Sequence, residues 1–276
     1  MKKALLWALA VVLTLASAVY QRMTGPTNPL RGKMSICDKE IAYRLTRSAE
    51  NRSVYQLKVR APQPVMGFVQ YMRFKKGDVW KPERGMPMVR RGETLVAPLA
   101  WPDSPDGLAP KAAKVAYTIN LFCPRGEAQD MTGGKPVIIR FKGPVPGWIL
   151  IPHILVMFLA MLTGMRGGLE ALQREGRTRK YALWTVILLF IGGFILGPLI
   201  QKLSFGAWWT GFPLGFDLTD NKTLIVFLGW LAALLVGGKS RHARWWVLAA
   251  AVLMLVVYLI PHSLLGSELD YTRVPR

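Results

Sequence analysis

The sequence has few of the side chains that enzymes most often use for nucleophilic or metal-dependent chemistry. Its 276 residues include only two cysteines and three histidines. It contains no Cys-x-x-Cys-His or His-Glu-x-x-His run, and no phosphate-binding loop, nucleophile elbow or paired-carboxylate hydrolase site. The sequence therefore favours a non-enzymatic role.

Acidic residues are also scarce, with 16 Asp and Glu against 36 Lys and Arg. Residues 20–147 alone contain 22 basic and 10 acidic residues, a net charge of +12 (22 − 10). An anion-binding face for phosphate headgroups or an acidic partner is one interpretation, with candidates Lys75, Lys76, Arg84, Arg90 and Arg91. We favour the simpler interpretation, a solvated outward face of strands.

The second half of the chain holds four long apolar runs, at residues 148–164, 181–200, 223–237 and 245–260. A soluble core does not bury four such runs in so short a stretch, so we predict four transmembrane helices. The third and fourth runs are short for a spanning helix and would have to include flanking residues.

A fifth apolar run, residues 4–19, follows Lys2 and Lys3. Ala16-Ser17-Ala18 suits cleavage as a signal peptide, whereas an uncleaved signal anchor ending at Tyr20 fits equally well and is slightly favoured. Both alternatives place the next segment outside the cytoplasm. The predicted domains are therefore 1–20 (signal peptide or anchor), 21–147 (exported domain), 148–262 (transmembrane bundle) and 263–276 (outer tail).

The distribution of basic residues supports the same orientation. The loops expected on the cytoplasmic side, 165–180 and 238–244, contain eight Lys and Arg, against four in the outer segments 201–222 and 263–276. Because positive residues concentrate on the cytoplasmic side, residues 21–147 are predicted on the periplasmic side of a bacterial inner membrane. A nucleic-acid partner is not expected there.

The exported segment alternates polar and apolar residues in short runs, as β-strands do. Residues 23–35 read as a loop, and strands are predicted at 41–46, 55–60, 66–74, 94–97, 115–121 and 137–141. This pattern predicts an antiparallel β-sandwich and hence an α+β membrane protein. Cys37 and Cys123 both fall in this segment, where a disulfide is favoured over a two-thiolate metal site.

Tyr71-Met-Arg-Phe, Gly92-Glu-Thr-Leu-Val-Ala-Pro-Leu and Lys114-Val-Ala-Tyr-Thr-Ile-Asn-Leu resemble an immunoglobulin- or fibronectin-III-like module. The resemblance implies a fold and no activity. Pro136-Val-Ile-Ile-Arg-Phe-Lys-Gly, Ile151-Pro-His and Phe216-Asp-Leu-Thr-Asp-Asn-Lys-Thr are similar to a family of bacterial inner-membrane proteins of uncharacterised function. That resemblance implies a location only.

Four polar residues in the apolar half are the candidate site. His153 and His262 flank the bundle, and Asp217 and Asp220 lie in an aromatic loop on the same predicted side. One hypothesis is haem or metal binding by His153 and His262, with the two aspartates as further metal ligands. The favoured alternative is that the histidines bond locally at helix ends and the aspartates order the loop, with Asp220 or Thr219 capping a helix.

The aromatic loop at residues 205–221 is predicted to fold back over the bundle, with Asp217 facing inward within reach of His153 or His262. Rows of small residues, Gly193-x-x-x-Gly197 and Gly229-x-x-x-Ala233-x-x-x-Gly237, predict close helix packing and allow oligomers. Three functions follow as hypotheses: an envelope protein presenting its β-domain to an envelope partner, a haem or metal redox subunit, and a transporter or channel component.

Overall fold

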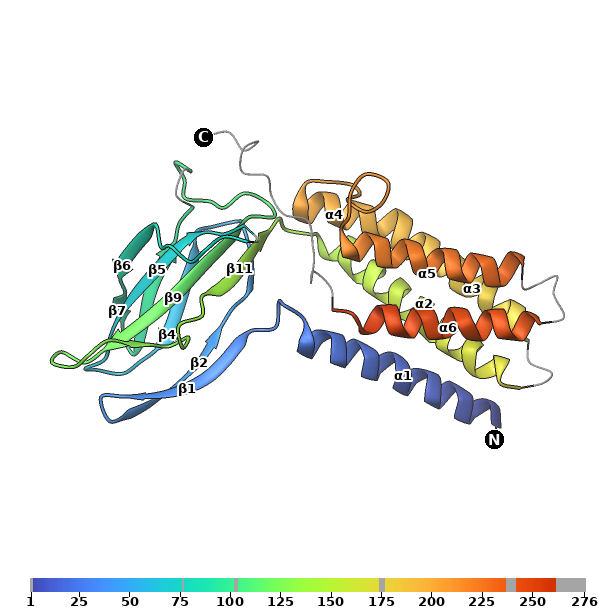
Figure 1. The fold of residues 1–276 in the computed structure, drawn as a ribbon, viewed down its shortest axis with the longest axis horizontal. Helices are drawn as coiled ribbons and strands as arrows, with labels where there is room; N and C mark the ends of the chain where they lie inside the picture. Colours follow the sequence, from blue (N-terminus) through green and yellow to red (C-terminus); the bar gives the residue numbers. More distant parts are fainter. Residues whose placement is uncertain (1, 76, 102–103, 174–176, 237–241, 262–276) are drawn as a thin grey trace. The chain divides into compact units, whose positions relative to one another are not determined.

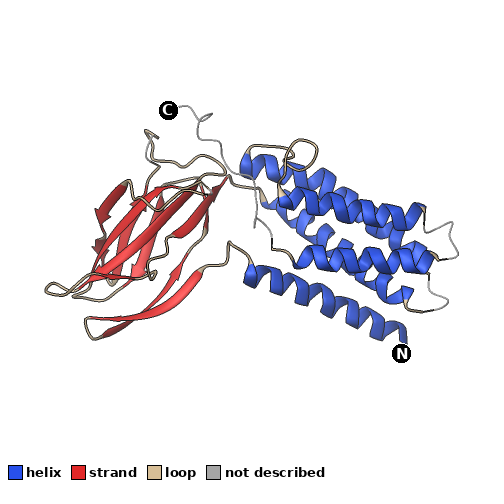
Figure 2. Ribbon diagram, in the orientation of Figure 1, coloured by secondary structure: helices blue, strands red, loops and turns tan. Residues whose placement is uncertain are grey.

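The chain combines α-helices and antiparallel β-sheets, which occupy separate parts of the sequence (Figure 2). The computed structural model describes residues 2–75, 77–101, 104–173, 177–236 and 242–261. It divides into two compact units. The helical unit joins the chain up to Pro26 with the chain from Val145 onward, and the β unit begins at Thr27 and ends its continuous stretch at Pro144.

The helical unit contains α1 (Lys2–Thr24), α2 (Gly147–Ala171), α5 (Leu218–Leu235) and α6 (Ala243–Leu259). Between α2 and α5, the helix α3 (Thr178–Leu189) continues through a π-helix, η1 (Phe190–Leu196), into α4 (Gly197–Phe205). Four helices are long and apolar enough to cross a membrane: Lys3–Thr24, Gly147–Ala171, Thr178–Phe205 and Leu218–Leu235. These features indicate a membrane protein.

The helices are longer than the apolar runs that predicted them. α1 continues to Thr24, and α5 begins at Leu218 because the side chain of Asp217 accepts a hydrogen bond from the Thr219 amide. The predicted cap at Thr219 or Asp220, with a helix start near 223, is therefore wrong. α6, at 17 residues, remains shorter than the other apolar helices.

Small residues set the spacing between helices. A Cβ added to Gly168 of α2 would lie 2.5 Å from the Cβ of Ala251 in α6, and one on Gly193 would lie 2.5 Å from a methyl group of Thr223 in α5. The predicted role of Gly193 in close packing is thus confirmed. Gly237 lies outside the described residues. α1 packs along both α2 and α6, so the first and last described helices are neighbours (Figure 1).

The β unit contains three sheets around one core. The two-stranded sheet pairs β1 (Leu30–Ile36) with β2 (Lys39–Leu45), and the three-stranded sheet has the order β4 (Tyr55–Arg60), β8 (Thr94–Leu99), β7 (Val89–Arg91). The largest sheet has the order β3 (Ser48–Glu50), β11 (Val137–Lys142), β9 (Lys114–Phe122), β5 (Met66–Arg73), β6 (Arg84–Pro87), with β10 (Gln129–Asp130) paired to β9. All described pairings are antiparallel except that of β3 with β11.

One cluster of buried side chains unites the sheets. It includes Leu45 of β2, Leu57 of β4, Leu99 of β8, Tyr117 of β9 and Phe141 of β11. The six predicted strands are all present, and several of them, such as β9, are buried on both faces over most of their length. The predicted loop at 23–35 is wrong, since β1 occupies most of it. The short strands β3, β6, β7 and β10 were also missed, because they carry little or no alternating pattern.

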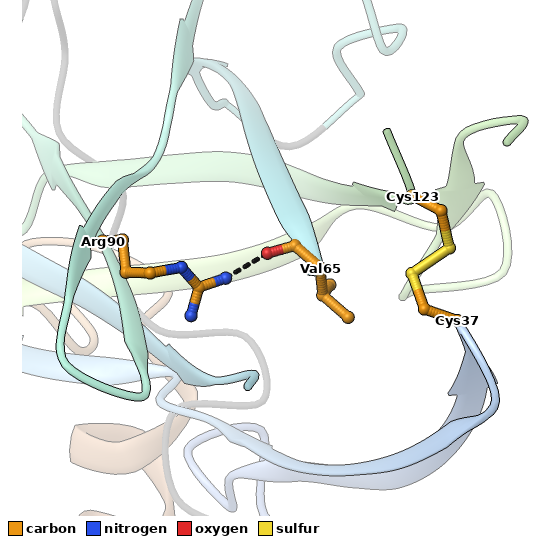
Figure 3. Close-up of a disulfide and its surroundings, with 4 residues drawn as sticks. All are labelled: Cys37, Val65, Arg90 and Cys123. Atoms are coloured by element: carbon orange, nitrogen blue, oxygen red, sulfur yellow. Dashed lines mark hydrogen bonds between the residues drawn. A yellow bond between two sulfur atoms is a disulfide. The ribbon is translucent and has the colours of Figure 1, made fainter. Parts of the chain in front are cut away.

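Cys37 and Cys123 form the predicted disulfide (Figure 3). It joins the turn between β1 and β2 to the chain just after β9, across a separation of 86 residues with Cα atoms 5.8 Å apart. Nearby, the guanidinium of Arg90 donates to the carbonyl oxygens of Ala61 and Val65 (Figure 3). This half-buried arginine, predicted as a candidate for anion binding, has a structural role here.

Candidate functional site at one end of the helical unit

Polar side chains gather where α1 and α6 end and α5 begins. Gln21 of α1 donates from Nε2 to the carbonyl oxygens of Tyr258 (2.9 Å) and Ile260 (3.3 Å). Lys222 of α5 donates from Nζ to the carbonyls of Ile260 (2.8 Å) and Pro261 (3.2 Å). The C-terminal end of a helix leaves carbonyls unpaired and carries partial negative charge, so an ammonium group there is stabilised.

Lys222 was expected in a solvated outer segment, but its side chain is buried, with 6% of the residue exposed. Asp217, also buried, is close enough to interact with the Lys222 ammonium electrostatically. A buried charge needs a partner of opposite sign or strong hydrogen bonds. The carbonyls at the end of α6 accept hydrogen bonds from Lys222, and the carboxylate of Asp217 supplies the opposite charge.

Asp220 organises the aromatic loop between α4 and α5. One carboxylate oxygen, Oδ2, accepts hydrogen bonds from the amides of Thr210 (2.6 Å) and Gly211 (3.1 Å), the Thr210 hydroxyl (3.1 Å) and Gln201 Nε2 (3.0 Å). The neighbouring Asn221 accepts from the Phe212 amide at 2.7 Å. The loop is therefore held against the start of α5 by Asp220 and Asn221, whereas its predicted position over the bundle, with Asp217 near a histidine, stays a prediction.

The side chains of this loop point largely away from the protein. Trp208, Phe212, Leu214 and Phe216 are 57%, 65%, 77% and 91% exposed. Trp209 differs, because its ring stacks on Phe194 of η1 with centroids 5.6 Å apart and its indole donates to the Phe212 carbonyl. The result is an ordered loop that presents four large apolar groups.

His153 lies in the first part of α2 and contacts η1. Its Nδ1 is 3.1 Å from the carbonyl oxygen of Gly192, which also accepts the Gly197 amide. A carbonyl oxygen only accepts hydrogen bonds, so Nδ1 carries a proton, and the neutral form of such a ring has its lone pair on Nε2. Histidines that bind metals commonly have this arrangement, with the second ring nitrogen bonded to a backbone carbonyl.

The structure gives three of the four predicted site residues different local roles. Asp217 caps α5, Asp220 holds the loop and His153 bonds to η1. His262 lies outside the described residues, so its pairing with His153 and the shared pocket with Asp217 remain predictions. Among the residues that the structure describes, no group of three His, Cys, Asp or Glu side chains could hold a metal ion.

Sequence reasoning missed a second polar group, around Arg166. This arginine was expected on the cytoplasmic side of the first apolar run, but not as a buried residue. It lies in α2, which continues to Ala171, and it is only 2% exposed. It forms an ion pair with Glu170, and its guanidinium carbon lies 5.6 Å from the ring centroid of Trp7 and 4.8 Å from that of Tyr181. The Glu four residues after the Arg was the available sequence signal.

Comparison with protein-family models, curated proteins and known structures finds no match to this chain.

Proposed function

We propose that this chain is an integral membrane protein that keeps α1 in its bundle and displays a basic, immunoglobulin-like β unit on the outer side of a bacterial inner membrane to bind another envelope component. The observation that carries the proposal is the position of the β unit in the chain. It is inserted between α1 and α2, two apolar helices that pack side by side in one bundle. The β unit is thus connected to the bundle at both of its ends, by α1 before it and by α2 after it.

Retention of α1 is supported by its packing. Ala10, Thr14 and Ser17 are buried at spacings of four and three residues, which places them on one helix face. Further toward the N-terminus, Trp7 covers the buried charge of Arg166. Cleavage after Ala18 would remove this helix face together with Trp7. The buried ion pair of Arg166 and Glu170 would then be exposed to lipid, which is costly.

An immunoglobulin-like sandwich is supported by the order of strands. Two of the three sheets, with the orders β4-β8-β7 and β3-β11-β9-β5-β6, contribute side chains to the same core. Two largely antiparallel sheets that share one core are the basic arrangement of immunoglobulin-like domains. The disulfide further supports an oxidising compartment.

The mass of the mature protein and the accessibility of the β unit test this proposal. With a C-terminal tag, the purified protein should retain residues 2–18 by intact mass spectrometry. Protease added to spheroplasts should digest the β unit and leave the helical unit. A mature N-terminus at Val19, or a β unit protected until the membrane is broken, would contradict the proposed architecture.

Partner binding is tested separately by site-specific photo-crosslinking in cells. Val79 and Val89 are apolar side chains of the β unit that are 84% and 62% exposed. A photoreactive residue at one of them, but not at buried Val69, should give a discrete product of higher mass. If neither these nor other exposed positions of the β unit give one, the partner proposal fails.

A redox subunit is the second candidate, favoured by the hydrogen bond that leaves Nε2 of His153 able to bind a metal or haem iron. The absorption spectrum of detergent-purified protein tests it. A Soret band that a His153→Ala variant loses and a His242→Ala variant keeps would support this function. Colourless, metal-free wild-type protein expressed with haem and metals supplied would exclude it.

A further inference from the structure

The hairpin of β1 and β2 has an unusual distribution of charge on its outward face. Arg31 and Arg44 are direct cross-strand partners, and both are exposed. Residues opposite each other on an antiparallel pair point to the same side with Cβ atoms about 4.5–5.5 Å apart, so two like charges there repel. Among the described residues, neither guanidinium has an acidic partner.

The opposite end of the same face is neutralised. Lys33 lies two residues after Arg31 and forms an ion pair of 2.8 Å with Glu40, which is opposite Ser35. The inward face is apolar, with Ile36, Ile41 and Leu45 in the core. Positive charge without a counter-charge is therefore concentrated at the open end of the hairpin, where the strands connect to the rest of the chain.

That end is also the one joined to α1. Residues 25–29 separate the last residue of α1, Thr24, from the first residue of β1. Arg31 is seven residues beyond Thr24, a length of chain that extends at most about 25 Å. This bound follows from chain length alone, whatever the arrangement of the two units. Arg22, in the last turn of α1, adds a further positive charge before the connection.

We propose that Arg31 and Arg44 together bind the phosphate of an anionic phospholipid headgroup, with α1 inserted in the same membrane. Guanidinium groups bind phosphate oxygens through paired N–H donors, and two of them on one sheet face can hold one phosphate between them. The phosphate would remove the repulsion between the two arginines. The inference rests on the membrane insertion of α1 in the proposed function but not on any protein partner.

Competition between lipids tests the proposal. The full chain in detergent is mixed with equimolar phosphatidylglycerol and phosphatidylcholine of the same acyl chains, and native mass spectrometry measures the ratio of bound lipids. Wild type should prefer phosphatidylglycerol by at least about fivefold, which is about 1 kcal/mol at 1.4 kcal/mol per tenfold change. The double variant Arg31→Gln/Arg44→Gln should show a ratio near one.

The matched control, Arg52→Gln/Arg125→Gln, removes two exposed arginines elsewhere in the β unit. It should keep the wild-type preference. Equal loss in both double variants would show a general effect of net charge and overturn the proposal, as would a wild-type ratio near one. Displacement of phosphatidylglycerol by millimolar inorganic phosphate would assign the pair to a free anion instead of a lipid.

The outcomes separate this inference from the proposed function. A protein that crosslinks to no envelope partner but keeps the Arg31- and Arg44-dependent lipid preference would contradict the partner alone. A protein that crosslinks to a partner without lipid preference would contradict the phosphate site alone.

Discussion

At the scale of single residues, Asp220 shows how one buried carboxylate orders a loop rich in glycine and aromatic residues. Asp220 receives four hydrogen bonds on one oxygen, two of them from backbone amides. Hydrogen bonds to a charged group are stronger than those between neutral groups. The exposed aromatic side chains of the loop are therefore positioned through the backbone amides that Asp220 binds.

Replacing Asp220 with alanine should loosen this loop. The amides of Thr210 and Gly211 would lose their acceptor, and each buried unpaired donor costs about 1–3 kcal/mol. Hydrogen exchange of residues 206–217 should become much faster in Asp220→Ala, while Asp106→Ala in the β unit should leave it unchanged. Unaltered protection in Asp220→Ala would show that the aromatic contacts hold the loop by themselves.

The buried Tyr117 makes the β unit sensitive to alkaline pH. Its hydroxyl donates to the Thr46 carbonyl at 3.2 Å, and burial raises its pKa above the usual value of 10.0. The unfolded chain releases this proton near pH 10 and the folded chain does not. The contribution to stability is therefore complete below pH 10 and falls above it, by about 1.4 kcal/mol per pH unit.

Urea unfolding of the β unit between pH 8 and 11 measures this effect. Tyr117→Phe should be less stable at pH 8, because it lacks the hydrogen bond, yet lose less stability above pH 10 than wild type. Tyr43→Phe, at a half-exposed position, is the control and should keep the wild-type slope. Parallel pH profiles for wild type and Tyr117→Phe would contradict the assignment.

At the scale of elements, sequence reasoning succeeded where one periodicity covered a whole segment. The apolar runs predicted α2 and α3 to within a few residues at their starts, and the alternation of large apolar residues predicted the strand β9, though not its burial on both faces. It failed at the ends of elements. Arg166 and Lys222 both lie outside the apolar runs and were not expected to be buried, but each has partners within the helical unit that keep it buried.

The same limit applies to the candidate site. The sequence pointed to Asp220 and to a folded loop, but not to Gln201 and Thr210 as the partners of Asp220. Gln201 lies in α4 and Thr210 lies ten residues before Asp220, so no local pattern connects them. Likewise, no sequence pattern identifies the Gly192 carbonyl as the partner of His153. Such contacts depend on how helices pack, which hydrophobic periodicity alone does not specify.

Gly168 tests the packing of α2 on α6. Any side chain there would meet Ala251, since the added Cβ already lies 2.5 Å from the Ala251 Cβ. Gly168→Val should force the helices apart and cost about 1–3 kcal/mol or more. Gly147→Ala is the matched control, because its Cβ would meet only Ile151 at 3.9 Å. The readout is the midpoint of thermal unfolding in detergent, and equal midpoints would show that the interface adapts.

At the scale of the whole molecule, the disulfide is the strongest covalent constraint on the β unit. Closing a loop of 86 residues should stabilise the unit by about 4 kcal/mol, mainly by restricting the unfolded chain. Cys37→Ser/Cys123→Ser should therefore unfold at much lower urea concentration than oxidised wild type. Reduced wild type should match the double variant, and a double variant as stable as the oxidised protein would contradict the prediction.

The contact between α1 and α6 has a consequence for biosynthesis. α1 is synthesised before α6, which begins 219 residues after α1 ends (243 − 24). Gln21 cannot reach its carbonyl partners at Tyr258 and Ile260 until those residues have been made. At a translation rate of about 5–20 residues per second, this interval is roughly 10–40 s. A nascent chain that stalls before Ala243 therefore contains Gln21 of α1 without either of these two acceptors, which exist only once the end of α6 has been made.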